Sequence, residues 1–109
     1  AAILLDRVGL AEEGIKHLRV AQGYAPDAGR IPYAIGLLQG ELGRLQESVA
    51  SMSSALRLEP QQDRWWYNLS NAQTRLGDLE AARASLEKAL ELAPQNEAYL
   101  QQYRRIGGQ

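Results

Sequence analysis

The chain has 109 residues, of which 45% are hydrophobic and 23% are charged, a balance typical of one soluble, folded domain. Its net charge of -1 gives no electrostatic surplus for binding nucleic acid or an anionic membrane, and no apolar run is long enough to span a bilayer. Cysteine is absent and His17 is the single histidine, so we expect no thiolate or histidine metal site and no cysteine nucleophile. We also expect no cofactor and no catalytic residues. The compartment, cytoplasm or periplasm, stays open.

The first residues predict a helix that begins without a capping residue. Residues 1–8 are mostly apolar and read as the tail of a first helix ending near Gly9, and residues 11–24 read as a second helix ending before Pro26. Because the chain starts with Ala in the middle of this pattern, we expect a fragment of a longer protein. An apolar edge formed by Ile3, Leu4 and Leu5 would then be covered by upstream residues or by a second copy in a homodimer.

Apolar residues recur at helical spacing in five further segments. These segments are residues 30–42, 46–58, 64–76, 79–92 and 97–106. Gly43 and Gly77 are expected to end the first and third, because glycine takes a left-handed cap without strain. Pro60 and Pro94 end the second and fourth, since proline lacks an amide donor and disfavours helix in the preceding residue. Asn96 is expected to be the N-cap of the last segment.

Several residue types recur together every 34 positions. Pro26, Pro60 and Pro94 show this spacing, and four further sets share it. The sets are Gly9, Gly43 and Gly77; Ala21, Ala55 and Ala89; Leu18, Met52 and Leu86; and Gly14, Ser48 and Ala82. Internal repetition is therefore the strongest pattern in the chain. It divides a single domain into a partial repeat (1–28), two helix-turn-helix repeats (29–62 and 63–96) and a C-terminal capping helix (97–109).

The unit 63–96 resembles the tetratricopeptide repeat, a 34-residue pair of helices. The residues that carry the resemblance are Trp66, Tyr67, Asn68, Leu69, Asn71, Ala72, Leu76, Gly77, Asp78, Ala82, Leu86, Lys88, Ala89, Leu90, Glu91, Leu92 and Pro94. The unit 29–62 matches less fully and has Pro32 where the family usually has an aromatic residue, a position in the first helical turn that tolerates proline. The resemblance implies an all-α fold, a right-handed superhelix (solenoid), in which the first helix of each repeat lines a concave groove that holds a protein or peptide.

Positions of the first helices that are not needed for the core are expected to face this groove. They are Arg30, Tyr33, Leu37, Glu41, Arg64, Tyr67, Asn68, Asn71, Arg75, Gln101 and Arg105. Four arginines face one glutamate, so we expect a mildly basic groove that prefers a neutral or acidic peptide. The alternative is that Tyr67, Asn68 and Asn71 are simply the usual residues of the repeat. The carboxylate clamp of chaperone-binding members is disfavoured, because only Asn68 matches it in one alignment and only Arg64 in the other.

The sequence therefore predicts a non-catalytic protein-interaction module that serves as a scaffold or adaptor within a larger protein. The acidic pairs Glu12 with Glu13 and Asp78 with Glu80 lie near the starts of second helices, where carboxylates favour the helix dipole. Trp65 and Trp66 fall at core positions of the repeat. Two alternatives remain open: a targeting or substrate-presenting arm of a larger enzyme, and a self-association element. A composition rich in Ala, Leu, Gln and Arg favours a bacterial source.

Overall fold

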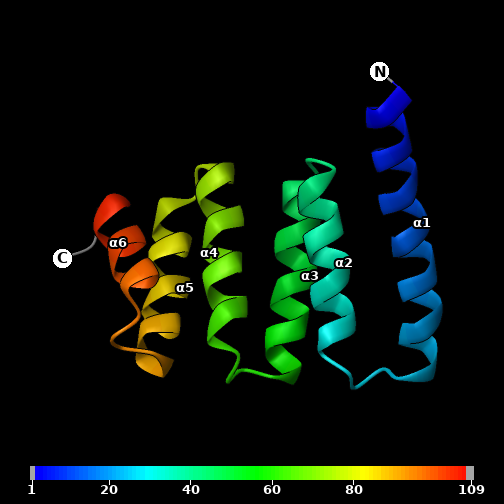
Figure 1. Cartoon of the computed structure of the whole chain (residues 1–109). Coiled ribbons are helices and arrows are strands. Elements are labelled where there is room, and N and C mark those ends of the chain that lie inside the picture. Colours follow the sequence, from blue (N-terminus) through cyan, green and yellow to red (C-terminus); the bar gives the residue numbers. More distant parts are fainter. Residues whose placement is uncertain (1, 108–109) are drawn as a thin grey trace. The chain divides into compact units, whose positions relative to one another are not determined.

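The computed structural model describes the backbone of residues 2–107 and the side chains of residues 7–107, and this part of the chain consists of α-helices without strands (Figure 1). The helices are α1 (Ala2–Tyr24), α2 (Arg30–Glu41), α3 (Leu45–Leu58), α4 (Asp63–Leu76), α5 (Leu79–Leu92) and α6 (Glu97–Arg105). The predicted all-α class is confirmed. None of the helices in the described part is both long and apolar enough to cross a bilayer.

The chain divides into two compact units, residues 1–58 with α1 to α3 and residues 59–109 with α4 to α6. In each unit, two helices joined by a short turn pack closely against each other, α2 with α3 and α4 with α5. All five helices predicted after Pro26 begin and end within one residue of the observed bounds. The assignment of residues 29–62 and 63–96 as repeats and the right-handed superhelix stay predictions.

The first helix differs from the prediction. A turn at Gly9 was expected, whereas α1 is continuous from Ala2 to Tyr24. Among the described residues, Gly43, Gly77 and Gly107 have a positive φ and Gly9 does not. Glycine inside a continuous helix costs only about 1 kcal/mol, so Gly9 is compatible with an uninterrupted α1. The side chains of Ile3, Leu4 and Leu5 lie outside the described ones, so the apolar edge and the homodimer stay predictions.

The pair α2 and α3 packs at very short range around Gly36. A Cβ atom at Gly36 would lie 2.8 Å from Cγ of Met52, so only glycine allows this approach. The Ser48 hydroxyl donates to the Gly36 carbonyl at 2.6 Å. Pro32 is buried in the first turn of α2, where its missing amide donor leaves no helical hydrogen bond unmade. The first turn of α2 therefore accepts proline, as predicted.

A polar bridge links the two helices of each pair. The Ser51 hydroxyl of α3 donates to Oε1 of Gln39 of α2 at 2.6 Å. Ser85 of α5 makes the same 2.6 Å bond to Gln73 of α4, and both partners lie 34 residues after their counterparts. In the described part of the chain, every buried side-chain nitrogen or oxygen has a hydrogen-bond partner.

Helices α4 and α5 are joined by a turn at Gly77, whose φ of 85° is left-handed. Asp78 is the N-cap of α5, and its side chain accepts from the Ala81 amide. The core of this pair contains Ala82 and Leu86, both fully buried. Trp66 packs against this core, and its indole donates to the Pro60 carbonyl at 2.8 Å. Trp66 is therefore a core residue, as expected.

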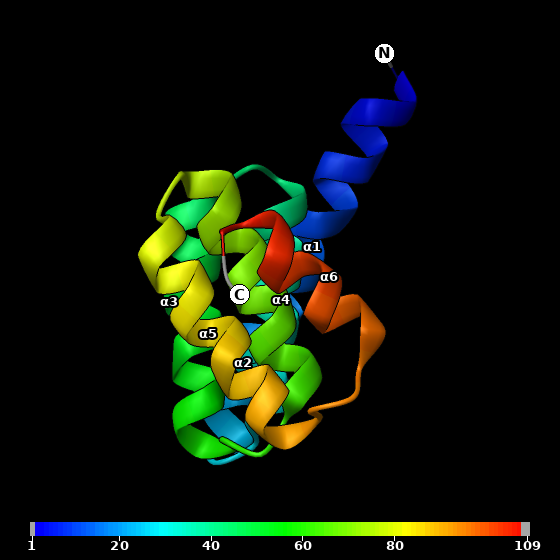
Figure 2. The same ribbon diagram turned by 90° about the vertical axis from the view of Figure 1, so that its left-hand side faces the viewer.

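The C-terminal helix α6 packs on α5 in the second unit (Figure 2). Asn96 is its N-cap, as predicted, because the Asn96 side chain accepts from the Tyr99 amide at 3.2 Å. Tyr99 is 5% exposed and belongs to one cluster with Leu86 and Ala89. This aromatic side chain fixes α6 to the helix pair.

Candidate functional site

A pocket of about 270 Å³ opens in the second unit between α4 and the start of α6. Its lining residues are Arg64, Tyr67, Asn68, Asn96, Ala98 and Tyr99. Arg64, Tyr67 and Asn68 were predicted to face the groove, and the helical spacing of α4 brings them to one pocket. The second unit therefore gathers three of the predicted residues at one place.

Two tyrosines form the aromatic wall of this pocket. The ring centroids of Tyr67 and Tyr99 are 4.8 Å apart, with 32° between the ring planes. The Tyr99 hydroxyl donates to Oδ2 of Asp63 at 2.6 Å. Burial, and then the hydrogen bond to Asp63, raise the pKa of Tyr99 to about 12. The Tyr99 hydroxyl therefore stays protonated at neutral pH, and it uses its proton in the hydrogen bond to Asp63.

The rim of the pocket carries one positive charge. Arg64 is exposed, makes no ion pair within residues 7–107, and lies near enough to Tyr99 to oppose the rise in its pKa. The amide side chains of Asn68 and Asn96 each carry both a donor and an acceptor. A guanidinium, two amides and an aromatic wall suit a peptide segment with carbonyl or carboxylate oxygens.

The remaining predicted residues of the second unit lie outside this pocket. Asn71 is half-buried and Arg75 exposed, farther along α4. Gln101 and Arg105 are exposed on α6. The pocket thus contains only the predicted residues from the first part of α4. The other four residues stay predicted contacts.

In the first unit, α2 presents an apolar hollow of about 460 Å³ lined by Ala34, Leu37, Leu38 and Glu41. Leu37 and Glu41 were predicted, and Leu37 is 41% exposed despite its apolar side chain. Arg30 is exposed and Tyr33 half-buried at the other end of α2. Only Leu37 and Glu41 of the predicted residues therefore share this hollow, and Arg30, Tyr33 and the continuous groove stay predictions.

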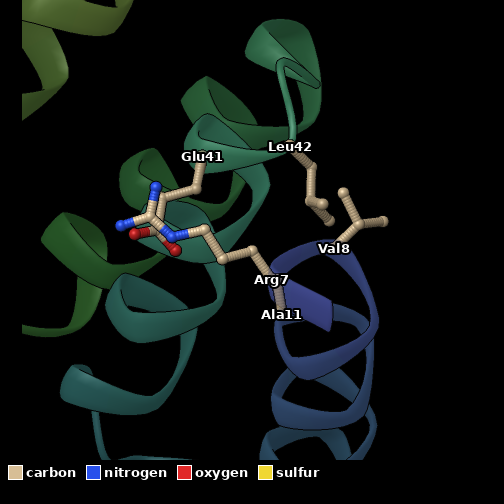
Figure 3. A pocket seen from close by; sticks show the side chains of 5 residues that line it. All are labelled: Arg7, Val8, Ala11, Glu41 and Leu42. Atoms are coloured by element: carbon tan, nitrogen blue, oxygen red, sulfur yellow. The ribbon is translucent and has the colours of Figure 1, made fainter. Parts of the chain in front are cut away.

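A second hollow of the first unit, about 280 Å³, lies between α1 and the end of α2 (Figure 3). It is lined by Arg7, Val8, Ala11, Glu41 and Leu42. In Figure 3 the Arg7 side chain extends toward Glu41, and Val8 faces Leu42. Sequence reasoning missed this hollow because the expected turn at Gly9 placed Arg7 and Ala11 on different helices.

The sequence prediction also missed Tyr99 and Asn96 as pocket residues. Tyr99 was counted only among the apolar residues of the last helix, and Asn96 only as its cap. The 34-residue register gives no signal that Tyr99 lines a pocket, because Tyr99 follows Trp65, a predicted core position, by 34 positions. In the described part of the chain, no group of three or more His, Cys, Asp or Glu is placed to hold a metal ion.

Comparison with known proteins decides the family. The family model described as tetratricopeptide repeat matches residues 33–97, which include α3, α4, α5 and most of α2. The chain belongs to the tetratricopeptide repeat family. Members of this family are generally protein-interaction modules, and that class holds for this chain. No curated protein matches the chain significantly.

Solved structures of tetratricopeptide repeat proteins have the same fold. The second such domain of human RPAP3, in complex with the HSP70 peptide SGPTIEEVD, is 19% identical, with a TM-score of 0.83 and coverage of 93% of this chain and 84% of that one. The type III secretion chaperone SycD of Yersinia enterocolitica, in complex with a peptide of the translocator YopD, is 16% identical, with a TM-score of 0.74 and coverage of 97% and 88%.

A mutant O-GlcNAc transferase of Thermobaculum terrenum is 27% identical to the chain, with a TM-score of 0.77. The match covers 96% of this tetratricopeptide repeat chain but only 20% of the transferase. This repeat fold thus also occurs as a small part of a larger enzyme chain.

Proposed function

We propose that this tetratricopeptide repeat chain binds a neutral or acidic peptide segment of a partner protein and acts as a non-catalytic scaffold or adaptor part of a larger protein. The observation that carries the proposal is the pocket of the second unit, where Arg64 and Asn68 lie beside the stacked rings of Tyr67 and Tyr99. The peptide complexes of RPAP3 and SycD support it, because both proteins share the fold.

Each predicted contact residue of α4, inside the pocket or beyond it, has a distinct task in this proposal. Arg64 offers a guanidinium that pairs with a carboxylate through two parallel hydrogen bonds. Asn68 and Asn71 bind the peptide backbone through their amides. Tyr67 provides apolar contact area, and Arg75 extends the positive charge along α4. The hollow beside Leu37 adds an apolar subsite in the first unit.

The chemistry of the ligand is tested by selecting binders from a library of random 12-residue peptides with the wild-type chain. Selected peptides are synthesised and their dissociation constants measured by fluorescence anisotropy. Exposed ion pairs contribute roughly 0.2–1 kcal/mol each, and reversing two charges adds repulsion. We therefore expect Arg64→Glu with Arg75→Glu to weaken the binding of acidic peptides about tenfold, and added salt to weaken the wild-type complex.

The matched control is Arg57→Glu, which reverses an exposed arginine on α3, the second helix of its pair. It should leave peptide affinity unchanged. If the selected peptides are basic, or if Arg57→Glu weakens binding as much as the double variant, the Arg64 pocket is not the binding site. Tyr67, Asn68 and Asn71 would then be structural residues of the repeat.

A second candidate function is that of a substrate-presenting arm in a larger enzyme. The match to a fifth of the transferase chain supports it. It predicts that the full reading frame encodes a catalytic domain whose activity toward protein substrates falls with Arg64→Glu, while activity toward a short acceptor peptide stays the same. A reading frame that contains repeats alone would contradict this candidate.

A further inference from the structure

The Asp63 carboxylate lies beside the peptide pocket without lining it. Asp63 is the first residue of α4 and is half-buried, whereas the pocket is lined by its neighbour Arg64 and by Tyr99 of α6. A carboxylate in direct contact with an acidic peptide would weaken binding, because like charges repel each other. Any favourable contribution of Asp63 to peptide binding must therefore act through another residue.

The residue that Asp63 contacts is Tyr99. The Tyr99 hydroxyl donates to Oδ2 of Asp63 at 2.6 Å, and hydrogen bonds to a charged acceptor at this distance are stronger than bonds between neutral groups. The ring of the same side chain stacks on Tyr67, with the ring centroids 4.8 Å apart. Tyr99 thus contacts α4 both with its ring and with its hydroxyl.

The start of α6 forms one wall of the pocket, so its position beside α4 decides the shape of the pocket. The helix α6 has nine residues, too few for a helix to be stable on its own. Among the helices it packs chiefly on α5. The contacts of Tyr99 with Tyr67 and Asp63 join it to α4 as well, and they connect the two walls of the pocket.

We propose that Asp63 is a positioning residue of the peptide pocket. Its carboxylate fixes the Tyr99 hydroxyl, and this bond holds the Tyr99 ring against Tyr67, so that the aromatic wall is formed before a peptide binds. Such preorganisation raises affinity, because the peptide does not have to order the side chain itself. This inference rests on the proposed function, since it assigns a role within the same pocket.

A carboxylate in the first turn of a helix also has an ordinary structural role. Asp63 is the acidic residue of the first turn of α4, where a negative charge favours the helix dipole. This role depends on the charge, so asparagine and alanine would remove it equally. The positioning role depends on an acceptor for the Tyr99 hydroxyl, which asparagine keeps and alanine lacks.

The test compares Asp63→Asn with Asp63→Ala. Both variants remove the negative charge, which by electrostatics alone should strengthen the binding of an acidic peptide. The probe is the tightest-binding acidic peptide from the library selection, carrying a fluorescent label, and affinity is measured by fluorescence anisotropy on variants that are folded by circular dichroism. We expect Asp63→Asn to bind at least as tightly as wild type and Asp63→Ala to bind about tenfold more weakly.

Tyr99→Phe removes the donor of the same bond and should weaken binding about as much as Asp63→Ala. The double variant should bind no more weakly than either single variant, because both changes remove one interaction. The matched control is Tyr103→Phe, which removes a hydroxyl of α6 that bonds to Glu87 at 2.9 Å and lies outside the pocket lining. It should leave affinity unchanged. Equal affinities of Asp63→Asn and Asp63→Ala, or of Tyr99→Phe and Tyr103→Phe, would overturn the proposal.

A second measurement tests the positioning role without a peptide. Nuclear Overhauser effects between the ring protons of Tyr67 and Tyr99 report the stacked arrangement in solution. We expect them in wild type, Asp63→Asn and Tyr103→Phe, and weaker ones in Asp63→Ala. Unchanged effects in Asp63→Ala would overturn the positioning role. If the effects change as expected but the selection yields no acidic peptide, Asp63 still positions the aromatic wall, and it is the proposed function that fails.

Discussion

Replacing Tyr99 with Phe would remove one hydroxyl and keep the ring that stacks on Tyr67 and packs with Leu86. The hydroxyl donates to Asp63 at 2.6 Å, across 36 residues of the chain. Hydrogen bonds to charged groups contribute about 1.5–3 kcal/mol, and Asp63 is only half-buried, so water replaces part of the lost interaction. We expect Tyr99→Phe to lower the free energy of unfolding at pH 7 by about 1–2 kcal/mol.

The same bond has a defined pH dependence. The pKa of Tyr99 is raised from its usual 10.0 to about 12 in the folded chain. Because the folded pKa is the higher one, this stabilisation is complete below pH 10 and is lost as the pH rises from 10 to about 12. The shift corresponds to about 2.7 kcal/mol at most, and solvent screening at the pocket lowers this figure. The stability difference between wild type and Tyr99→Phe should therefore shrink above pH 10.

The assay is urea unfolding followed by tryptophan fluorescence, which reports on the second unit because Trp65 and Trp66 both lie on α4. Tyr103→Phe is the matched control, since the Tyr103 hydroxyl donates to an exposed carboxylate, that of Glu87. It should have the smaller effect. The reasoning is refuted if the two variants have equal stability, or if the loss in Tyr99→Phe is the same at pH 7 and pH 12.

Four further substitutions test the turn, helix and core assignments by the same unfolding measurement, with circular dichroism as the probe. Gly77→Ala should destabilise the chain by about 1–2 kcal/mol, because a Cβ at a φ of 85° is strained. Gly9→Ala should stabilise it by about 0.5–1 kcal/mol, because Gly9 lies inside α1 with open space around it; a loss of stability would indicate a turn. Leu86→Ala should cost about 2–5 kcal/mol, whereas Leu92→Ala at a 43% exposed position should cost far less, and equal losses would contradict the assigned core.

The helices after Pro26 could be predicted closely because each boundary depends on a residue with its own conformational effect. Gly43 and Gly77 take a left-handed backbone, and Asn96 caps α6 through its side chain. These effects are local, so they are readable without knowledge of the tertiary structure. Gly9 shows the limit of this reasoning, since it lies in the same register as Gly43 and Gly77 but stays helical inside α1.

The candidate site could be predicted only in part. Arg64, Tyr67 and Asn68 share one side of α4, and helical periodicity alone is enough to group them. The contribution of Tyr99 depends on its contact with Asp63, 36 residues away. A pattern of apolar spacing indicates that Tyr99 is buried, but it carries no information about the partner of the hydroxyl. Contacts between helices distant in sequence were therefore the part that sequence reasoning missed.

The glutamine and serine bridges have a consequence for how the chain folds. Two helix pairs of similar sequence can mispair or slide past each other by one turn, since apolar side chains tolerate many partners. Gln39 is only 3% exposed, so a shifted α3 would leave its amide without the Ser51 hydroxyl, at a cost of about 1–3 kcal/mol. The two hydrogen bonds thus favour the native alignment of each helix pair, because a shifted alignment would lose the hydrogen bond between glutamine and serine.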